Sequence, residues 1–392
     1  MTEEFQRDFI HDYLGPMMEL NHPEIKLLIF DHNKNNMTSW VDTVLKPPKN
    51  MKYVDGVAFH WYSGLNDREM DGTYGYDETN LTHHRWPDKI LLATEGCSCP
   101  GVQLNDWFRA ERFAHDVIFD LLSHVQGWVD WNLLLDAEGG PNHKGNTCDA
   151  PIIATEDFSS IVVQPKFYYM GHISKFVPPG SRRIAGTVVG NFNYASFDPK
   201  VRAGFEAGLF SCERSPRQTW QFSDSGTFAL KDASLQDDVK RKLCISGGVS
   251  DRQVIRMDYC EENEYSAPLQ LSHEDGSSIR ETVSGKCFSV FGGSLESGAL
   301  LELVECKKNE VKQQFNINST TGEVTSVLNG YCLTAGWPFL TGASFIDNVE
   351  STITVLMNES PLDSEVILHD GIRDQQVLFG INGRSIQTIV YN

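Results

Sequence analysis

Short apolar runs that end in polar residues alternate with helical patterns through the first half of the chain. Four of these runs are apolar on both faces, which predicts buried parallel strands. They are Lys26–Asp31, Val54–His60, Ile90–Glu95 and Gly127–Leu133. Their ends recur at intervals of roughly 30 residues or slightly more, a spacing typical of βα units.

Helical periodicity fills the intervals between the runs. It predicts helices over residues 5–20 and 165–176. A further amphipathic helix is predicted before the fourth run, with an apolar side of Trp107, Phe108, Phe113, Val117, Ile118, Leu121, Leu122 and Val125. The alternation predicts an α/β fold with a parallel sheet, such as a (β/α)8 TIM barrel, in which catalytic side chains follow the carboxyl ends of the strands.

The pattern changes after Arg182, where the segments become short, strand-like and rich in turn residues. Cysteines recur with a hydrophobic anchor at three similar places, namely Cys212 with Trp220, Cys260 with Leu269, and Cys306 with Phe315. A second set of cysteines, Cys244, Cys287 and Cys332, recurs at nearly the same interval. Three such repeats predict an all-β unit with pseudo-threefold symmetry.

The last part of the chain predicts further strands without cysteines. Four runs alternate with turn residues, and we expect them to form an antiparallel meander. They are Thr352–Met357, Glu365–His369, Gln376–Phe379 and Ser385–Tyr391.

Charge and cysteine content narrow the classes of function. The 392 residues include 53 acidic and 33 basic side chains, a net charge of −20 that argues against nucleic-acid binding and suits an acidic compartment. No apolar run approaches the roughly 20 residues that span a bilayer. Nine cysteines and the glycosylation sequons at Asn36, Asn80, Asn318 and Asn358 favour an oxidising compartment. We therefore expect a lysosomal or secreted protein whose signal peptide lies upstream of Met1.

Acidic, aromatic and amide side chains gather at the predicted strand ends. They are Asp31, His60, Trp61, Tyr62, Glu95, Asp130, Trp131 and Asn132. Aromatic rings stack on sugars, amides and acids bind hydroxyl groups, and a carboxylate can attack an anomeric carbon. We therefore predict carbohydrate chemistry centred on Glu95.

Each of these residues also has a structural interpretation. Glu95 could be an ion-paired structural acid, His60 a hydrogen-bonded structural residue, and Asp31 a loop cap. Trp61 and Trp131 could fill the core. Glu138, in the turn-rich loop that follows, is a formal candidate for a second carboxylate.

Cofactor chemistry finds no support in the motifs. His83 and His84 are adjacent, and the cysteines lack the paired C-x2-C spacing of a zinc site. No phosphate-binding loop and no serine nucleophile elbow occurs. We expect neither a metal nor a cofactor.

Several ordered motifs resemble glycoside hydrolase family 30, and within it the lysosomal acid glucosylceramidases. The resemblance covers residues 1 to about 190 and resumes near Thr341–Asn392. It is carried by Gln6–Ile10, Gly56–Tyr62, Ala93–Cys97, Gly127–Leu133, Glu138–Asn142 and Tyr169–Gly180. It implies that residues 1–182 supply strands five to eight of the barrel. It also implies that residues 183–199 and 339–392 form a β-sandwich.

The resemblance also implies roles for individual residues. Glu95 matches the catalytic nucleophile of a retaining glycosidase, and Tyr62 and His60 match residues beside it. Trp131 matches an aromatic wall of the sugar pocket and Asn146 a polar residue on its rim, and we add Asp31 and Trp61 as substrate-binding candidates. A retaining mechanism needs a second carboxylate about 5 Å from the nucleophile.

The family's acid/base glutamate lies in an Asn-Glu-Pro motif that this chain does not contain. Met1 falls just downstream of the expected position of that motif. We therefore expect residues 1–392 alone, as a fragment or incomplete gene model, neither to fold stably nor to turn over substrate.

Residues 200–338 resemble a ricin-type β-trefoil inserted into the sandwich. The motifs are Gln218-Thr219-Trp220 and Gln313-Gln314-Phe315. The resemblance implies disulfides Cys244–Cys260, Cys287–Cys306 and Cys212–Cys332. Ricin-type sugar sites usually carry an Asp where this chain has Ser246, Ser289 and Thr334. Both a glycan-binding domain and a structural spacer stay open.

Three hypotheses of function follow. The first is a retaining β-glucosidase acting on glucosylceramide or related β-glucosides, with peripheral contact to a membrane compatible with such a substrate. The second is another family 30 specificity, such as a β-xylosidase or a galactanase. The third is a non-catalytic protein that binds glycans through the trefoil.

Overall fold

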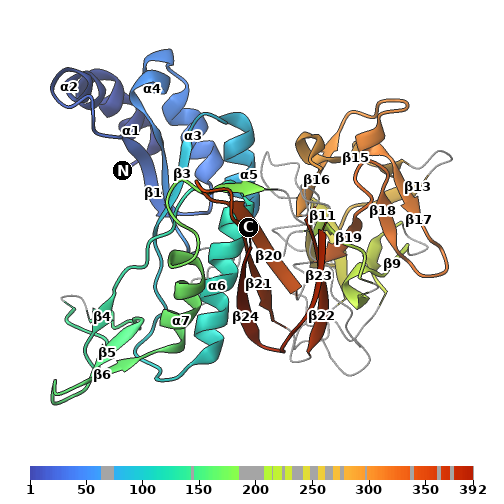
Figure 1. The fold of residues 1–392 in the computed structure, drawn as a ribbon. Helices are drawn as coiled ribbons and strands as arrows, with labels where there is room; N and C mark the ends of the chain where they lie inside the picture. The colour runs from blue at the N-terminus through green and yellow to red at the C-terminus, as the bar shows by residue number, and fades with distance from the viewer. Residues whose placement is uncertain are drawn as a thin grey trace. The chain divides into compact units, whose positions relative to one another are not determined.

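The chain divides into two compact units, Met1–Pro179 and Gly180–Asn392 (Figure 1). The structure is a computed structural model of residues 1–392. It describes all of them except 63–74, 143–144, 185–206, 214, 223–225, 232–241, 248–254, 261–267, 274–277, 296–297, 336–339, 360–362, 371–374 and 392. Part of the predicted boundary between sandwich and trefoil, residues 185–199 and 339, therefore lies outside the described residues.

The first unit alternates strands and helices. Its strands are β1 (Leu28–Asn33), β2 (Gly56–His60), β3 (Ile90–Glu95), β4 (Leu134–Leu135), β5 (Ile152–Ala154) and β6 (Ile161–Val163). Its helices are α1 (Glu3–Phe9), the π-helix η1 (Ile10–Leu14), α2 (Gly15–Asn21), α3 (Met37–Leu45), α4 (Pro48–Tyr53), α5 (Tyr76–Arg85), α6 (Trp107–Leu122) and α7 (Pro165–Ser174).

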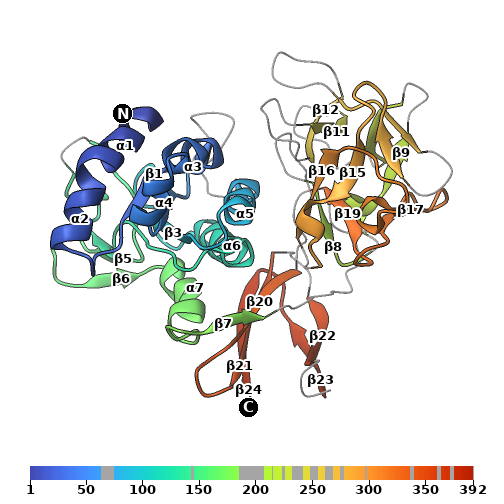
Figure 2. The ribbon, with the colours of Figure 1, turned by 90° about the horizontal axis from the view of Figure 1, so that it is seen from above.

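The strands β1, β2 and β3 form a parallel sheet in that order. The helices α3, α5 and α6 follow one another along one side of the sheet (Figure 2). Buried side chains of α3 such as Met37 and Val41 pack against Val57 and Leu91 of the strands. This alternation is that of the predicted α/β fold.

The fourth predicted strand, Gly127–Leu133, is wrong as a strand. Only Trp128 forms a parallel bridge, with Ala93 of β3. The backbone nitrogen of Val129 donates to the Ala93 oxygen at 2.8 Å, so the chain runs beside β3 for a few residues. Beyond them the Trp131 nitrogen donates to the oxygen of Gly96, which lies past the end of β3.

The predicted helices form with two differences. The helix expected over residues 5–20 is a continuous helical run of α1, the π-helix η1 and α2. The helix α6 buries Phe113, Val117 and Ile118 as predicted, but Trp107 and Phe108 are exposed. Both lie in the first turn after the N-cap Asp106, ahead of the stretch that faces the core.

The second unit consists of strands and short 3-10 helices. Its strands are β7 (Arg182–Ile184), β8 (Ala207–Phe210), β9 (Trp220–Phe222), β10 (Phe228–Leu230), β11 (Leu243–Gly247), β12 (Ile255–Tyr259), β13 (Leu271–His273), β14 (Ile279–Glu281), β15 (Cys287–Val290), β16 (Ala299–Val304), β17 (Phe315–Ile317), β18 (Val324–Ser326), β19 (Cys332–Ala335), β20 (Leu340–Ile346), β21 (Thr352–Asn358), β22 (Ser364–Asp370), β23 (Gln375–Ile381) and β24 (Ser385–Tyr391). Its 3-10 helices are η3 (Pro216–Gln218), η5 (Phe291–Gly293) and η6 (Val311–Gln313).

One hydrophobic core unites the strands from β8 to β19. It contains buried side chains from all three sequence repeats, including the anchors Trp220 and Phe315. The disulfides Cys212–Cys332, Cys244–Cys260 and Cys287–Cys306 are present, the same three pairs that the trefoil resemblance implied. In the sequence this region separates β7 from β20, which pair with each other antiparallel.

The predicted meander after residue 340 is wrong in its pairing. The strand β21 lies between β20 and β24, while β22 and β23 form a separate two-stranded sheet. Every residue of β21 is buried, which suits a central strand. In contrast, Ile367 of β22 and Leu378 of β23 are exposed. None of the helices in the described part of the chain is long and apolar enough to span a bilayer.

A buried cluster of charges links the sheet of the first unit to α6. Lys34, just after β1, is fully buried, and its Nζ donates to Oδ1 of Asp116 and of Asp120, each at 2.8 Å. The hydroxyl of Tyr76 and the indole nitrogen of Trp128 also donate to Asp116, each at 2.9 Å. The ammonium group thus holds two carboxyl groups that lie one helical turn apart.

Burial, reinforced by the nearby Asp116 carboxylate, raises the pKa of Asp120 well above its usual range. Burial alone would lower the pKa of Lys34, but the carboxyl groups of Asp116 and Asp120 outweigh it and the pKa is raised. The cluster therefore pairs one buried ammonium group with two carboxyl groups, of which Asp120 holds its proton to a higher pH than an ordinary aspartate does.

Replacing Lys34 by Met should lower the free energy of unfolding by about 3–5 kcal/mol, because Asp116 and Asp120 lose the buried cation to which both are bonded. The matched control is Lys52→Met, because Lys52 forms an exposed pair with Glu19. It should change stability by less than about 1 kcal/mol. Urea unfolding of both variants measures the difference, and equal effects would contradict a buried charge cluster.

Asp120 predicts a pH dependence of stability. Because its folded pKa is raised, the folded chain retains a proton that the unfolded chain releases above the ordinary pKa of an aspartate. The contribution of Asp120 to the unfolding free energy is therefore greatest at low pH and declines as the pH rises. Asp120→Asn should make stability depend less on pH than in the parent chain. Thermal unfolding over a range of pH measures this, and the same pH dependence in both chains would contradict a raised pKa of Asp120.

Candidate active site

Two β-bulges shape the carboxyl end of the parallel sheet. In β1, Asp31 is an extra residue between Phe30 and His32, whose partners Ala58 and Phe59 are consecutive in β2. In β3, Thr94 is an extra residue between Ala93 and Glu95, whose partners Phe59 and His60 are consecutive in β2. The two extra residues meet, because the hydroxyl of Thr94 donates to Oδ1 of Asp31 at 2.7 Å. A bulge re-aims the side chains that follow it, and bulges are common beside active sites.

The first bulge requires unusual backbone angles. Phe30 and Asp31 have φ values of 79° and 53°, in the left-handed region. An Asp adopts this region more readily than most residues, whereas a bulky Phe does not. The ring of Phe30 is buried in the core of the first unit. Core packing therefore supports the strained turn that presents Asp31.

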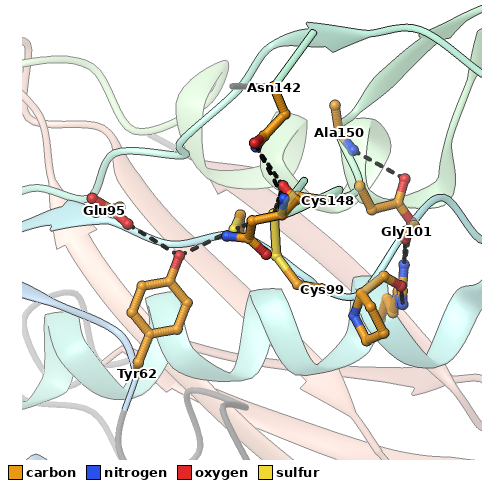
Figure 3. Close-up of a disulfide and its surroundings, with 12 residues drawn as sticks. Tyr62, Glu95, Cys99, Gly101, Asn142, Cys148 and Ala150 are labelled. Carbon is orange, nitrogen blue, oxygen red and sulfur yellow. Dashed lines mark hydrogen bonds and ion pairs between the residues drawn. A yellow bond between two sulfur atoms is a disulfide. The ribbon is translucent and has the colours of Figure 1, made fainter. Parts of the chain in front are cut away.

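Glu95 ends β3, with its side chain 21% exposed. The hydroxyl of Tyr62 donates to its Oε1 at 3.2 Å (Figure 3). Nε2 of His60 lies 3.6 Å from Glu95 Oε2 and 3.3 Å from Asp31 Oδ1. The structure thus brings together four of the residues that the sequence singled out, Asp31, His60, Tyr62 and Glu95.

Tyr62 acts as a neutral donor to Glu95. Its burial raises the pKa of the phenol far above the usual value, with the nearby Cys97 and Glu95 adding to the effect. The phenol therefore keeps its proton. Since its O–H donates to Glu95, the thiol of Cys97, 3.0 Å away, is left to donate to the Tyr62 oxygen.

The residue after Glu95 has to be a glycine. A Cβ at Gly96 would lie 2.4 Å from the indole ring of Trp128. That ring packs edge-on against Phe113 and Trp61. The backbone at Glu95 therefore rests directly on an aromatic core.

Trp61 belongs to this core, with 2% of its surface exposed. A ring in that position has little free face on which a sugar could stack, so this burial does not support the predicted substrate-binding role. The alternative that the sequence left open, a core-filling role, agrees with the structure.

Trp131 and Asn146 are exposed near the site. Trp131 is 56% exposed, and only its backbone nitrogen bonds to the Glu95 segment, at Gly96. The backbone of Asn146 is held by the side chain of Asn142. Among the described residues, neither side chain hydrogen-bonds to Glu95. Glu138 is exposed in its loop, where its backbone nitrogen donates to Asp136.

The sequence reasoning missed a disulfide, Cys99–Cys148, behind Tyr62 and Glu95 (Figure 3). The sulfur atoms of Cys97, Cys99 and Cys148 lie within 4.8 Å of one another, the spacing of a possible metal site. Because two of them are bonded to each other, this state offers one thiol rather than three thiolate ligands. The three cysteines left after the trefoil pairs were the only indication in the sequence.

Comparison with known proteins agrees with this geometry. Residues 1–177 match the glycosyl hydrolase family 30 TIM-barrel domain, and residues 195–315 match the ricin-type beta-trefoil lectin domain. The first unit is a glycoside hydrolase family 30 domain. The lysosomal acid glucosylceramidase of Mus musculus is 40% identical over 189 residues, 47% of this chain and 36% of that protein. The chain spans less than half the length of the curated relatives it matches.

Solved structures share the fold at low sequence identity. SrfJ of Salmonella typhimurium matches with a TM-score of 0.55 and 17% identity, over all of this chain and 53% of its own. An endo-β1,6-glucanase matches with a TM-score of 0.50 and 16% identity, over 99% of this chain and 53% of its own. These two likenesses concern the fold alone.

The trefoil positions that were compared with sugar sites are buried. Ser246, Ser289 and Thr334 are at most 2% exposed. The amide of Gln218 donates to the Thr334 hydroxyl at 3.0 Å, inside the unit. Hydroxyl groups placed in this way serve the packing of the trefoil and present nothing to a glycan.

Two tryptophan variants should separate the core from the sugar-binding surface. Trp61→Ala should reduce the free energy of unfolding by about 3–5 kcal/mol, as for other buried aromatic residues. Trp131→Ala, at an exposed position, should change it by no more than about 0.5 kcal/mol and weaken binding of a glucose-like inhibitor roughly tenfold. Chemical unfolding and calorimetry measure the two effects. Unchanged inhibitor binding would contradict a sugar-binding role of Trp131.

Proposed function

We propose that this chain carries the nucleophile-bearing part of a retaining β-glucosidase of the glucosylceramidase type. The observation that carries the proposal is the carboxylate of Glu95 at a strand end, hydrogen-bonded by Tyr62 and flanked by His60. In this proposal, residues 1–182 correspond to strands five to eight of a (β/α)8 barrel. Residues 183–199 and 339–392 form the sandwich, and residues 200–338 the inserted trefoil.

Glu95 is proposed to attack the anomeric carbon and form a covalent glycosyl–enzyme. The attacking carboxylate has to be held in one orientation toward the anomeric carbon. The hydrogen bond from the Tyr62 hydroxyl to Oε1 of Glu95 supplies that restraint. His60, between Glu95 and Asp31, positions both carboxyl groups at the same rim. Trp131 is proposed as a wall of the sugar pocket and Asn146 as part of its rim.

Departure of an ordinary alcohol requires an acid that protonates the glycosidic oxygen. The family's Asn-Glu-Pro motif does not occur in residues 1–392. Asp31 lies beyond His60 from Glu95 and is engaged by Thr94. We infer that in any folded form of this chain without such a motif, Glu95 forms the covalent intermediate only with leaving groups that need no proton.

The substrate proposed is a glucosylceramide or a related β-glucoside, and the place of action a lysosome. Both follow from the similarity to the mouse lysosomal acid glucosylceramidase. The net charge of −20 supports an acidic compartment, where partial protonation of the acids reduces repulsion within the chain.

An activated inhibitor tests the proposal without the missing acid. The inhibitor is a 2-deoxy-2-fluoro-β-glucoside whose dinitrophenolate group leaves without being protonated. It should add one fluoroglucosyl group to Glu95, which peptide mass spectrometry detects. The unactivated methylumbelliferyl β-glucoside should show no turnover. Xylosyl and galactosyl analogues should label more slowly, which would separate the glucosidase from other family 30 specificities.

Two variants serve as controls. Glu95→Gln should abolish the label, whereas Glu138→Gln, in an exposed loop, should label at the parent rate. Labelling of another residue, or labelling that persists in Glu95→Gln, would contradict the proposal that Glu95 is the nucleophile. Hydrolysis of the unactivated glucoside by the 392-residue chain would overturn the inference about the acid.

A further inference from the structure

Three sulfur atoms lie in contact beside the candidate nucleophile. The thiol sulfur of Cys97 is 3.1 Å from the Cys99 sulfur and 3.3 Å from the Cys148 sulfur. Cys99 and Cys148 form a disulfide, and Cys97 is the free, buried cysteine. The nearly equal distances place the thiol beside the disulfide, within reach of either of its atoms.

We propose that Cys97 and the Cys99–Cys148 disulfide form a thiol–disulfide exchange site, a property that does not depend on the proposed glycosidase function. The Cys97 thiolate attacks the Cys148 sulfur, the Cys97–Cys148 bond forms and the Cys99–Cys148 bond breaks. Cys99 leaves as a thiolate and takes up the proton that Cys97 released. The step needs neither an oxidant nor a reductant.

The backbone already holds the exchanging segments side by side. The nitrogen of Asp149 donates to the oxygen of Ser98, and the nitrogen of Gly101 donates to the oxygen of Thr147, both at 2.8 Å. These bonds hold the segment with Cys97 and Cys99 next to the segment with Cys148. Exchange to Cys148 keeps the two segments cross-linked and requires mainly a change of side-chain rotamers.

The exchange is coupled to Tyr62 and thereby to Glu95. A thiolate attacks along the axis of the disulfide, and the Cys97 sulfur lies to the side of that axis. To attack, the Cys97 side chain must move from its present position, where its sulfur lies 3.0 Å from the Tyr62 hydroxyl. The same hydroxyl donates to Glu95. The exchange therefore changes the hydrogen bonding of the group that supports Glu95.

Acid should favour the state seen in the structure. Burial raises the pKa of the Cys97 thiol. The hydrogen bond with Tyr62 and the charge of Lys166 oppose this, while the carboxyl groups of Glu95 and Asp130 add to it. Since only the thiolate attacks, exchange is slow at acidic pH and accelerates as the pH rises.

Disulfide mapping of the full chain tests the proposal. The chain is incubated at about pH 5 or about pH 8.5, on either side of the range in which cysteine thiols begin to ionise, then quenched in acid and alkylated. At the higher pH, Cys99 should become alkylated and a Cys97–Cys148 peptide should appear. At the lower pH, Cys97 should be the main alkylated cysteine of the three. Alkylation of Cys97 alone at both pH values would overturn the proposal.

Two variants keep the test decisive. In Cys99→Ser, Cys97 and Cys148 should form a disulfide in the same glutathione buffer in which the parent forms Cys99–Cys148; two free thiols would refute the proposal. Tyr62→Phe, which removes only the hydroxyl, should change the rate of exchange several-fold because that hydroxyl contacts the attacking thiol, whereas an unchanged rate would contradict the coupling to Tyr62. The Cys244–Cys260 pair, in the other unit, should stay intact throughout and serves as the internal control.

Discussion

The site depends on one carboxylate that is held at the end of a buried parallel strand by a neutral hydroxyl. Glu95 has to be near solvent to meet a substrate, yet its backbone rests on Trp61 and Trp128. Tyr62 makes this arrangement chemically useful because its proton is retained by burial and directed at Glu95. Asp31 and His60 reach the same rim only because a bulge in each neighbouring strand changes the register there.

The layer beneath the site supports Glu95 through packing and hydrogen bonds. The helix α6 contributes Phe113 to the aromatic floor and Asp116 to the buried charge cluster. Trp128 joins the two, because its ring packs on Phe113 and its nitrogen donates to Asp116. A displacement of α6 would therefore disturb the support of Glu95 as well as the core of the unit.

Hydrophobic patterning predicts the parts of the fold in which local and tertiary preferences agree. The strand Ile90–Glu95 forms over its predicted residues, since its apolar run is buried as a central strand would be. The run Gly127–Leu133 has a similar pattern, yet only Trp128 bridges to β3, its ring packs against Phe113 and Trp61, and the strand does not continue. The pairing of β21 with β20 and β24 could not be read from the order of strands along the chain, because neighbours in a sheet need not be neighbours in sequence.

Long-range contacts were the least predictable part of the site. Lys34 and its partner Asp116 are separated by 82 residues, so no local pattern joins them. The trefoil disulfides were implied by the resemblance to a ricin-type trefoil, whereas no resemblance indicated Cys99–Cys148. Glu95, Tyr62 and His60 could be singled out because strand ends in such folds gather functional side chains. The burial of Trp61 agrees with strand alternation, since His60 and Tyr62 on either side of it face Glu95.

The most direct test of the account is a crystal structure of the chain with a glucose-configured iminosugar, whose cationic nitrogen imitates charge at the anomeric centre. The account predicts that the nitrogen lies at hydrogen-bond distance, about 3 Å, from a Glu95 oxygen while Tyr62 bonds to the other. An iminosugar bound away from Glu95, or a Glu95 side chain turned from it, would contradict the account.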